Sequence, residues 1–590
     1  MIILTMFFKW DKPSTTMAST ISTKKPSNTI FIRKQQNISA VVLNYKRPEL
    51  VHNLIEILLK NENIKEIILS NGNYETKIEF PNIPKIKVFN DYGENNETYG
   101  LHLRFLRAQD ALYDKILIID DDIIPTQSVL NNLLCIDLDV MVGYYGRIIP
   151  YSDHFNKKMN NHVPIILTKF MLINKSLAEM YMKIISEKSE LIDILKMGKP
   201  WGNGEDILIS ALSMYITDKL NICLRMPEIK DVGNNCPNAI CNRNGTNEHK
   251  KYRMNLCKFL FKNSNELTDN IKSFFTTILF NERIKHYLGS NYSNKNVYES
   301  NTSINLCSIY NLKQISEKKY GISSNLNIQG LYINPLINNL QKYKNKNFLC
   351  QLGDRCKNNE VDKSWSFSNH DIIDDFSFAK IRRTEEENIV ILRCFNINRH
   401  WAHYYNKKTD IDFSTKKPLI LWRGCTTGFE DNDKHNRFNF VKKWYGTENI
   451  DIGFNIVMKN NANYLKYKKN GMSIEKMLQY KYIVSIEGND KDSGLNWKLN
   501  SSSLIFMAKP ICISWLMEDT LIPNVHYIEL KDDYSDLLEK YSWCEKNQTE
   551  CMKIIKNANN FMDQFKNPHI EEYIENEVIK LYFNKLKITS

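Results

Sequence analysis

Regular hydrophobic patterning begins near residue 37, where continuous apolar runs of six or seven residues alternate with amphipathic stretches. Runs of this length that are apolar throughout are typical of strands buried on both faces of a parallel sheet. The pattern predicts helices at about 48–60 and 103–113. The predicted strands around them are 38–44, 64–70, 85–90 and 115–120. Strands that alternate with helices in this way indicate an α/β domain.

A second α/β pattern fills the C-terminal half of the chain. Its predicted strands are 347–352, 389–395, 418–422, 450–454, 482–486, 503–506 and 525–530, and the tail 536–586 is predicted to be helical. Residues 234–299 between the two patterns are polar and rich in Asn, as expected of a connection between domains. The predicted organisation is a disordered tail 1–36, a domain 37–250, a connecting region 251–320 and a domain 321–590.

Composition narrows the class of protein. The 590 residues are 42% hydrophobic and 25% charged, which excludes wholesale disorder. Thirteen cysteines without a C-x-x-C pair predict free thiols and no zinc ribbon. No run approaches the roughly 20 apolar residues of a membrane span, and we expect a cytosolic protein. The net charge of +12 leaves binding of nucleic acid or another polyanion as an alternative function.

The strongest chemical feature of the first domain is the triplet Asp120-Asp121-Asp122, which begins at the last residue of a predicted strand. Adjacent carboxylates at the end of a buried strand repel one another unless a cation lies there. Alternate residues point to the same side, so Asp120 and Asp122 can face one site. Their oxygen atoms suit Mn²⁺ or Mg²⁺, which can bridge to a diphosphate. A solvated acidic turn is the structural alternative.

A second acidic pair, Glu205-Asp206, follows a glycine-rich loop at the start of a predicted helix. A carboxylate there can act as a base or orient an acceptor hydroxyl. Residues 37–235 resemble the exostosin-type glycosyltransferase domain. The segments that carry the resemblance are Ala40–Asn44, Arg104-Phe105, Ile118–Asp122, Thr168–Lys175 and Glu205–Leu208.

This resemblance implies a GT-A fold, a UDP-sugar donor and Mn²⁺. It also implies that Asp120 and Arg104 contact the nucleotide-sugar, that Asp122 together with Asp120 holds the metal, and that Asp206 serves the acceptor side. The acidic segments match well and the sequence between them loosely, so the sugar is not implied.

In the second domain, the predicted strand 418–422 ends at Arg423-Gly424, followed by small hydroxyl residues and a second glycine. Such a segment can bring backbone N–H groups and a guanidinium to a phosphate. Arg437, at the start of a predicted helix, is a second candidate for a phosphate contact. An ordinary polar loop and a surface charge are the structural alternatives.

Residues 345–565 resemble the lipopolysaccharide-modifying and protein O-glucosyltransferase family, which includes capsule-associated xylosyltransferases. The matching segments are Leu421–Gly424, Thr427-Gly428, Arg437-Phe438, Asp451–Phe454, Lys481–Asp490, Ser493–Phe506, Val525–Tyr527 and Lys531–Leu537. The resemblance implies a GT-B fold with two Rossmann-like lobes, UDP-glucose or UDP-xylose as donor, inversion of the anomeric centre and no metal.

The same resemblance assigns roles to individual residues. Arg423 and Gly424 would bind the diphosphate, and the segment from Ser493 would bind the nucleotide. The eukaryotic family members have an arginine where this chain has Gly494 or Leu495, and Lys498 is the candidate that replaces its charge. Asp354 is the candidate base, with Asp374 and Asp375 as rivals and a structural carboxylate as the alternative.

The sequence therefore predicts an enzyme with two glycosyltransferase modules, the first dependent on a metal and the second not. Its partners would be a UDP-sugar and a hydroxyl acceptor on a glycan, a glycolipid or a protein, with no nucleic acid. Two alternatives remain open. The first is a single active module with an N-terminal module that only binds acceptor, and the second is the polyanion-binding protein.

Overall fold

The structure is a computed structural model. It describes residues 36–44, 47–72, 78, 80, 83–91, 93–149, 161–187, 189–197, 203–224, 228–232, 246–289, 298–300, 306–307, 333–350, 377–386, 389–395, 397–406, 408–428 and 436–588. The candidate base Asp354 and its rivals Asp374 and Asp375 lie outside these ranges.

The N-terminal region contains an eight-stranded sheet with the strand order β3-β2-β1-β4-β10-β6-β11-β8. The strands are β1 (Ile38–Asn44), β2 (Ile64–Asn71), β3 (Ile86–Asn90), β4 (Lys115–Asp120), β6 (Val142–Gly143), β8 (Asn161–Val163), β10 (Phe170–Asn174) and β11 (Asn221–Cys223). The four predicted strands are confirmed and pair in parallel. The chain steps outward from β1 to β2 and β3 and then returns to β4 on the other side of β1.

The expectation of a purely parallel sheet is wrong at β10, which runs antiparallel to both β4 and β6. A parallel neighbour needs a crossover connection, usually helical. In the described residues between β6 and β10 there are only short strands, namely β7 (Gly146–Arg147), β8 and β9 (Ile165–Ile166). The sheet is therefore mixed, with a parallel half that contains β1 and β4.

Helices cover this sheet because their apolar residues recur at helical spacing. In α1 (Pro48–Leu59), for example, Val51, Leu54, Ile55 and Leu58 are buried. The other helices are α3 (Leu103–Gln109), α4 (Gln127–Leu134), α5 (Lys175–Ile185), α6 (Glu190–Met197) and α7 (Glu205–Thr217). The residues of α7 are buried from Glu205 to Tyr215, so this helix is central to the module.

Part of the predicted connecting region 251–320 is helical and packed. It contains most of α9 (Thr246–Leu260) and all of α10 (Asp269–Leu288). Leu256, Leu260, Ile271 and Phe275 are buried in the same hydrophobic cluster as α7. The polar composition of the region reflects the exposed faces of two amphipathic helices, which a count of polar residues does not separate from a linker.

The C-terminal region contains a five-stranded sheet, all parallel, with the order β22-β21-β23-β24-β26. The strands are β21 (Lys417–Cys425), β22 (Ile450–Ile456), β23 (Tyr480–Val484), β24 (Leu504–Ala508) and β26 (Ile528–Leu530). The chain steps from β21 to β22 on one side and returns to β23 on the other. Helices α14 (Arg437–Trp444), α16 (Leu495–Leu499), α17 (Leu537–Lys546) and α18 (Gln548–Asp563) accompany the sheet.

One parallel sheet is what a single lobe of the predicted GT-B fold would contain, and the division into two lobes stays a prediction. In the described residues between 333 and 416, the strands form pairs only, such as β18 (Phe378–Ala379) with β20 (Val390–Ile391). The predicted long strand 389–395 is wrong, since β20 is followed by a 3-10 turn at Arg393–Phe395. The apolar run reflects burial rather than strand geometry, because that turn is buried among the helices.

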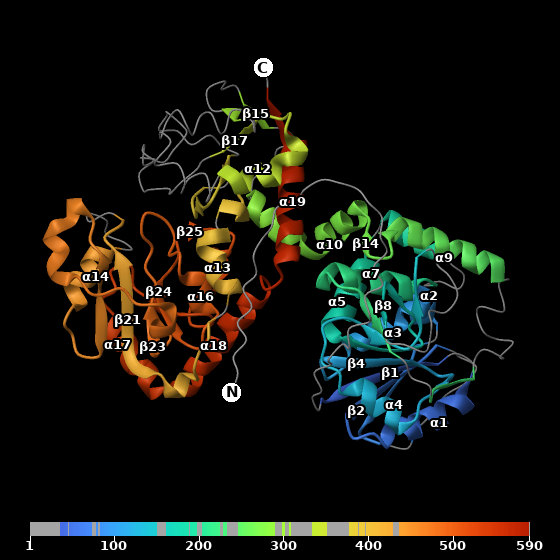
Figure 1. Cartoon of the computed structure of the whole chain (residues 1–590). Helices are drawn as coiled ribbons and strands as arrows, with labels where there is room; N and C mark the ends of the chain where they lie inside the picture. Colours follow the sequence, from blue (N-terminus) through green and yellow to red (C-terminus); the bar gives the residue numbers. More distant parts are fainter. Residues whose placement is uncertain are drawn as a thin grey trace, which may run out of the picture.

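The two regions share packed surfaces. Helix α10 lies against α19 (Pro568–Lys585), as Figure 1 shows in green and red. Arg283 of α10 forms a two-pronged ion pair with Glu571 of α19, with both N–O distances 2.8 Å. Tyr215 of α7 stacks on Tyr573 at 5.2 Å between ring centroids. One hydrophobic cluster extends from Val41 to Phe583 and so includes residues of both regions.

Candidate active sites

The acidic triplet meets an arginine at the point where the N-terminal sheet reverses its strand order. Arg47 follows β1, and Asp121 and Asp122 follow the neighbouring strand β4. The guanidinium of Arg47 lies 2.5 Å from Asp121 Oδ1 and 2.8 Å from Asp122 Oδ2. Open α/β sheets bind their ligands at this switch point, outside the carboxyl ends of the strands. The Arg47 side chain is 21% exposed.

Arg104 joins the triplet to the second acidic pair. It is almost fully buried on α3, and its Nη1 lies 2.9 Å from Asp120 Oδ1. Its Nη2 lies 3.8 Å from Glu205 Oε1, which also accepts a hydrogen bond from Thr168. Burial opposes the charge of Arg104, yet Asp120, Glu205 and Asp206 raise its pKa. The structure thus brings together residues from four separate predicted segments.

Asp206 has a partner that the sequence interpretation missed. Arg253, on α9, contacts Asp206 Oδ2 and donates a hydrogen bond of 2.9 Å to Asn203 Oδ1. The predicted domain end at residue 250 separates Arg253 from this site. A buried carboxylate at 206 needs a compensating cation, which the basic residues downstream, from Lys219 to Arg253, can supply. That requirement was the one available signal.

Electrostatics around the triplet favour an added cation. One further ion pair lies nearby, between Lys169 and Asp231 at 3.0 Å. Together with the pairs already described, it makes a network of six carboxylates and only four basic groups. Burial and the neighbouring Asp120 raise the pKa of Asp122. Burial and Asp206 raise the pKa of Glu205 to about 7. The excess of acid is the electrostatic condition under which a divalent cation binds.

The donor atoms fit a metal that also takes ligands from its substrate. Asp122 Oδ1 is buried and has no hydrogen-bond partner, so it is one available carboxylate oxygen beside Asp120. Within the described ranges, no three His, Cys, Asp or Glu side chains are grouped to hold a metal by themselves. Mg²⁺ and similar ions are commonly held by one or two carboxylates, with phosphates and water completing the shell. The residues fit Mn²⁺ or Mg²⁺ in that way.

The second candidate site lies between the ends of β21 and β23, the switch point of the C-terminal sheet. Two loops meet there, since the backbone N–H of Gly428 donates a 2.9 Å hydrogen bond to Asn489 Oδ1. Gly428 has a φ of +93°, and a β-carbon on it would lie 3.4 Å from the backbone oxygen of Gly488. Glycine permits both the left-handed backbone and the close approach. The predicted Thr427-Gly428 and Lys481–Asp490 segments are therefore adjacent.

Arg437 lies at the centre of these loops, at the first position of α14. Its guanidinium donates to Thr427 Oγ1 at 2.6 Å and to the carbonyl oxygens of Ile486 and Glu487 at 2.8 and 3.0 Å. A β-carbon on Gly488 would lie 2.9 Å from the guanidinium carbon. No carboxylate among the described residues forms an ion pair with Arg437, and burial lowers its pKa. A guanidinium without an ion pair at this edge can attract a phosphate.

The other predicted cations of this site are already paired. Arg423 Nη2 lies 2.8 Å from Asp451 Oδ1, and its Nη1 donates to the carbonyl oxygens of Trp422 and Asp451. Lys498 is buried and contacts Asp492, whose pKa is lowered to about 2 although burial opposes this. Both cations orient neighbouring backbone rather than face open space.

Two further predicted residues lie close to these loops. Gly424 is half-buried, and a β-carbon there would lie 2.5 Å from the ring of Trp422. Ser493 is half-buried and belongs to the loop that leads into α16. The structure thus places Gly424 near the end of β21, Arg437 at the start of α14, Ser493 on the loop before α16 and Lys498 within α16.

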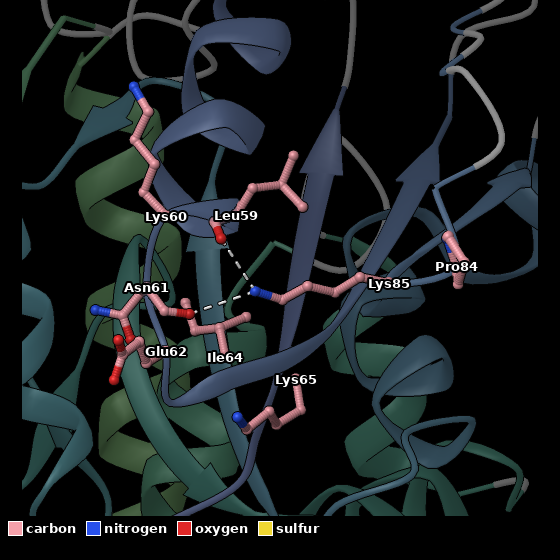
Figure 2. Close-up of a pocket in the computed structure, with 8 residues that line it drawn as sticks. All are labelled: Leu59, Lys60, Asn61, Glu62, Ile64, Lys65, Pro84 and Lys85. Atoms are coloured by element: carbon pink, nitrogen blue, oxygen red, sulfur yellow. Dashed lines mark hydrogen bonds between the residues drawn. The ribbon is translucent and has the colours of Figure 1, made fainter.

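A surface depression of about 530 Å³ lies elsewhere, near the beginning of β2 and β3. Figure 2 shows that its lysines do not converge on one point, because Lys85 turns toward the carbonyl oxygens of Leu59 and Asn61. It lies at the opposite edge of the sheet from Asp120, and none of the predicted site residues lines it.

Comparisons with known proteins match the two regions separately. Residues 38–268 match the family model "Glycosyl transferase family 64 domain", and residues 368–589 match "Glycosyl transferase family 90". O-glucosyltransferase LpsA of Dichelobacter nodosus is 33% identical over 201 residues, which are 34% of this chain and 59% of that protein. Protein O-glucosyltransferase 2 of Danio rerio is 34% identical over 76 residues, 13% of this chain and 15% of that protein.

Uncharacterized protein 179R of Invertebrate iridescent virus 6 is 30% identical over 121 residues, which cover 19% of this chain and 10% of that protein. The chain spans less than two thirds of the length of each of these relatives. Among solved structures, the mannosyltransferase PcManGT from Pyrobaculum calidifontis, in complex with GDP-Man and Mn²⁺, matches 34% of this chain and 58% of its own, at 14% identity and a TM-score of 0.24.

None of the helices in the described part of the chain combines the length and the apolar character that crossing a membrane requires. The family matches coincide with the two sheets and with the two sets of loops at their switch points. The N-terminal region is therefore similar to glycosyl transferase family 64 and the C-terminal region to glycosyl transferase family 90.

Proposed function

We propose that this chain is a two-module glycosyltransferase that moves sugars from UDP-sugar donors to hydroxyl acceptors on a glycan, a lipid or a protein. The observation that carries the proposal is that each module gathers its charged residues at a switch point. In one module Arg47 and Arg104 face the triplet from Asp120, and in the other Arg437 lies between two loops. The family matches support glycosyl transfer as the chemistry of both.

In the N-terminal module, Asp122 Oδ1 and a carboxylate oxygen of Asp120 would hold Mn²⁺ or Mg²⁺. A divalent ion bound there would neutralise the diphosphate and stabilise the departing nucleotide. Arg104 would fix the orientation of Asp120 through its 2.9 Å contact. Asp206, held by Arg253, would serve the acceptor side, with the ion pair fixing the carboxylate relative to Asn203.

In the C-terminal module, Arg437 would bind the donor diphosphate together with the backbone N–H groups of the Thr427-Gly428 loop. The acceptor oxygen would attack the anomeric carbon, its proton would pass to a carboxylate, and the bond to the UDP oxygen would break with inversion. We assign the proton acceptor to Asp354, and an Asp354→Asn variant is the direct test of that role.

A second candidate function is favoured by one observation. Arg47 already places a guanidinium on Asp121 and Asp122, as a metal would place its charge. Under this second function, the N-terminal module binds acceptor without catalysing transfer, and the C-terminal module contains the single active site. Insensitivity of total activity to EDTA favours it.

The experiment that tests the proposal is transfer and hydrolysis of a panel of UDP-sugars by the full-length chain, with and without Mn²⁺. The variants are Asp122→Ala and Arg437→Met. Each is expected to remove one activity and leave the other. Wild-type turnover by both variants on every donor that the wild type uses contradicts the assignment of the sites.

A further inference from the structure

The C-terminal sheet ends at its β22 edge in an exposed surface that combines apolar and basic side chains. We call it the amphipathic rim, and its members are Ile456, Met458, Lys459, Leu465, Lys466 and Lys468. Ile456, Met458 and Leu465 are 52%, 50% and 55% exposed. Three large apolar side chains exposed within ten residues are unusual unless they contact a partner.

The charges of the rim have one sign. Lys459, Lys466 and Lys468 are exposed, and no carboxylate among the described residues forms an ion pair with them. The sequence contains no Asp or Glu from Ile452 to Ile474. Exposed lysines are usually interspersed with acids, as Lys553 is with Glu550 on α18. The rim therefore presents uncompensated positive charge beside apolar side chains.

The rim is anchored to the fold. Tyr464 is buried and its ring lies 4.8 Å from that of Phe438, so the neighbouring Leu465 is held at the surface. The backbone N–H of Lys469 donates a 2.8 Å hydrogen bond to Phe454. A β-carbon on Gly453 would lie 2.9 Å from the carbonyl oxygen of Tyr467, so glycine permits this close packing. The apolar side chains are presented by a supported segment.

The rim also adjoins the candidate site. The backbone N–H of Met458 donates a 2.8 Å hydrogen bond to Thr426 Oγ1, and Asn461 Nδ2 donates to the Thr426 carbonyl oxygen at 3.2 Å. Thr426 belongs to the loop that leads to Gly428, whose N–H donates a hydrogen bond to Asn489 on the second loop. A partner that contacts the rim lies next to the loops around Arg437.

We propose that the amphipathic rim docks the C-terminal module on an anionic membrane surface. Apolar side chains that enter the headgroup region, surrounded by lysines that attract anionic lipids, are the chemistry of interfacial binding. The charge complementarity selects this partner over a second copy of the chain, since two rims carry the same charge. The rim would bring an acceptor in the membrane to the site, an inference that rests on the proposed function, whereas the docking itself does not.

Vesicle co-sedimentation of the full chain tests the docking without any activity measurement. The vesicles contain phosphatidylcholine alone or phosphatidylcholine with phosphatidylserine. The wild type is expected to bind the anionic vesicles only. The triple variant Lys459→Gln, Lys466→Gln, Lys468→Gln is expected to bind roughly a hundredfold more weakly, at about fivefold for each lysine. The matched control Lys546→Gln, Lys556→Gln, Lys566→Gln removes three exposed lysines of the α17–α18 side and is expected to bind as the wild type does.

A second triple variant, Ile456→Ser, Met458→Ser, Leu465→Ser, separates docking from simple ion exchange. It is expected to weaken binding about tenfold or more. Unchanged binding of this variant overturns the proposal in favour of a polyanion site, and equal loss in the lysine control overturns it in favour of general charge attraction. A wild-type dimer in gel filtration that the serine variant abolishes overturns it in favour of self-association. Loss of glycosyl transfer with vesicle binding intact counts against the proposed function alone.

Discussion

The Arg253 guanidinium, on α9, contacts the Asp206 carboxylate in the first turn of α7. Both side chains are buried, and Arg253 also donates a hydrogen bond to Asn203. A helix that composition assigned to a connecting region thus supplies the cation of the acidic pair in the N-terminal site. The family match over residues 38–268 also includes α9.

Removing Arg253 is expected to lower the free energy of unfolding by about 3–5 kcal/mol, because an uncompensated carboxylate stays buried at Asp206. Arg253→Leu combined with Asp206→Asn is expected to recover most of this loss, since the buried charge is gone. Urea denaturation of both variants measures the difference. A double variant as unstable as Arg253→Leu alone contradicts the pairing. Neither the single nor the double variant is expected to keep the proposed activity of the N-terminal module.

Arg437 and Arg423 are expected to respond differently to substitution. If Arg437 binds the donor diphosphate as proposed, Arg437→Met removes charge-assisted hydrogen bonds and is expected to raise the KM for the UDP-sugar roughly 10–100-fold. Arg423→Met leaves the Asp451 carboxylate without its guanidinium and is expected to act mainly through stability. Steady-state kinetics and thermal unfolding of the two variants check this contrast. Equal KM changes in both contradict it.

Glu205 is expected to impose a pH dependence on stability. Its pKa is about 7 in the folded protein against an ordinary value of 4.5, so the folded state keeps a proton that the unfolded state releases. The free energy of unfolding therefore falls as pH rises from about 4.5 to about 7, and this contribution is fully favourable only below that window. Glu205→Gln is expected to remove the slope.

Denaturation of wild type and Glu205→Gln at several pH values isolates this contribution, since other groups titrate in both. The exposed Glu62 supplies a matched control, and Glu62→Gln is expected to keep the wild-type slope. A Glu205→Gln slope equal to that of the wild type shows that Glu205 ionises normally.

The contact between α10 and α19 is expected to join the modules energetically. Arg283→Met leaves Glu571 buried without its cation and is expected to cost about 3–5 kcal/mol of unfolding free energy. Lys285 on the same helix forms an exposed pair with Glu282, so Lys285→Met is expected to change stability by less than about 0.5 kcal/mol. Calorimetry compares them. Equal effects of the two substitutions contradict a larger contribution of the buried pair to the free energy of unfolding.

Strands with continuous apolar runs were predictable because burial on both faces of a parallel sheet leaves a local signature. β1 and β4 match their predictions residue for residue. The antiparallel direction of β10 was not predictable, since direction depends on the connection and not on the strand's own residues. The turn at Arg393–Phe395 shows the converse, because a short buried apolar run does not distinguish strand from turn.

The candidate site residues were predictable where they end or follow a strand, as Asp120 and Asp122 do. The basic residues that pair with these carboxylates were not predictable from the sequence. Arg47 and Arg253 are ordinary basic residues in sequence and acquire their roles only when the fold brings them to Asp122 and Asp206. Arg423 and Arg437 look alike in sequence, and only the ion pair with Asp451 separates them. Pairing across distant segments has no local pattern to reveal it.

The most direct test of two nucleotide-sugar sites in one chain is the stoichiometry of UDP binding to the full-length protein by calorimetric titration in the presence of Mn²⁺. The account predicts two sites per chain. One is lost with EDTA or Asp122→Ala, and the other is lost only with Arg437→Met. A single site in the wild type, or two sites that persist when both substitutions are combined, contradicts it.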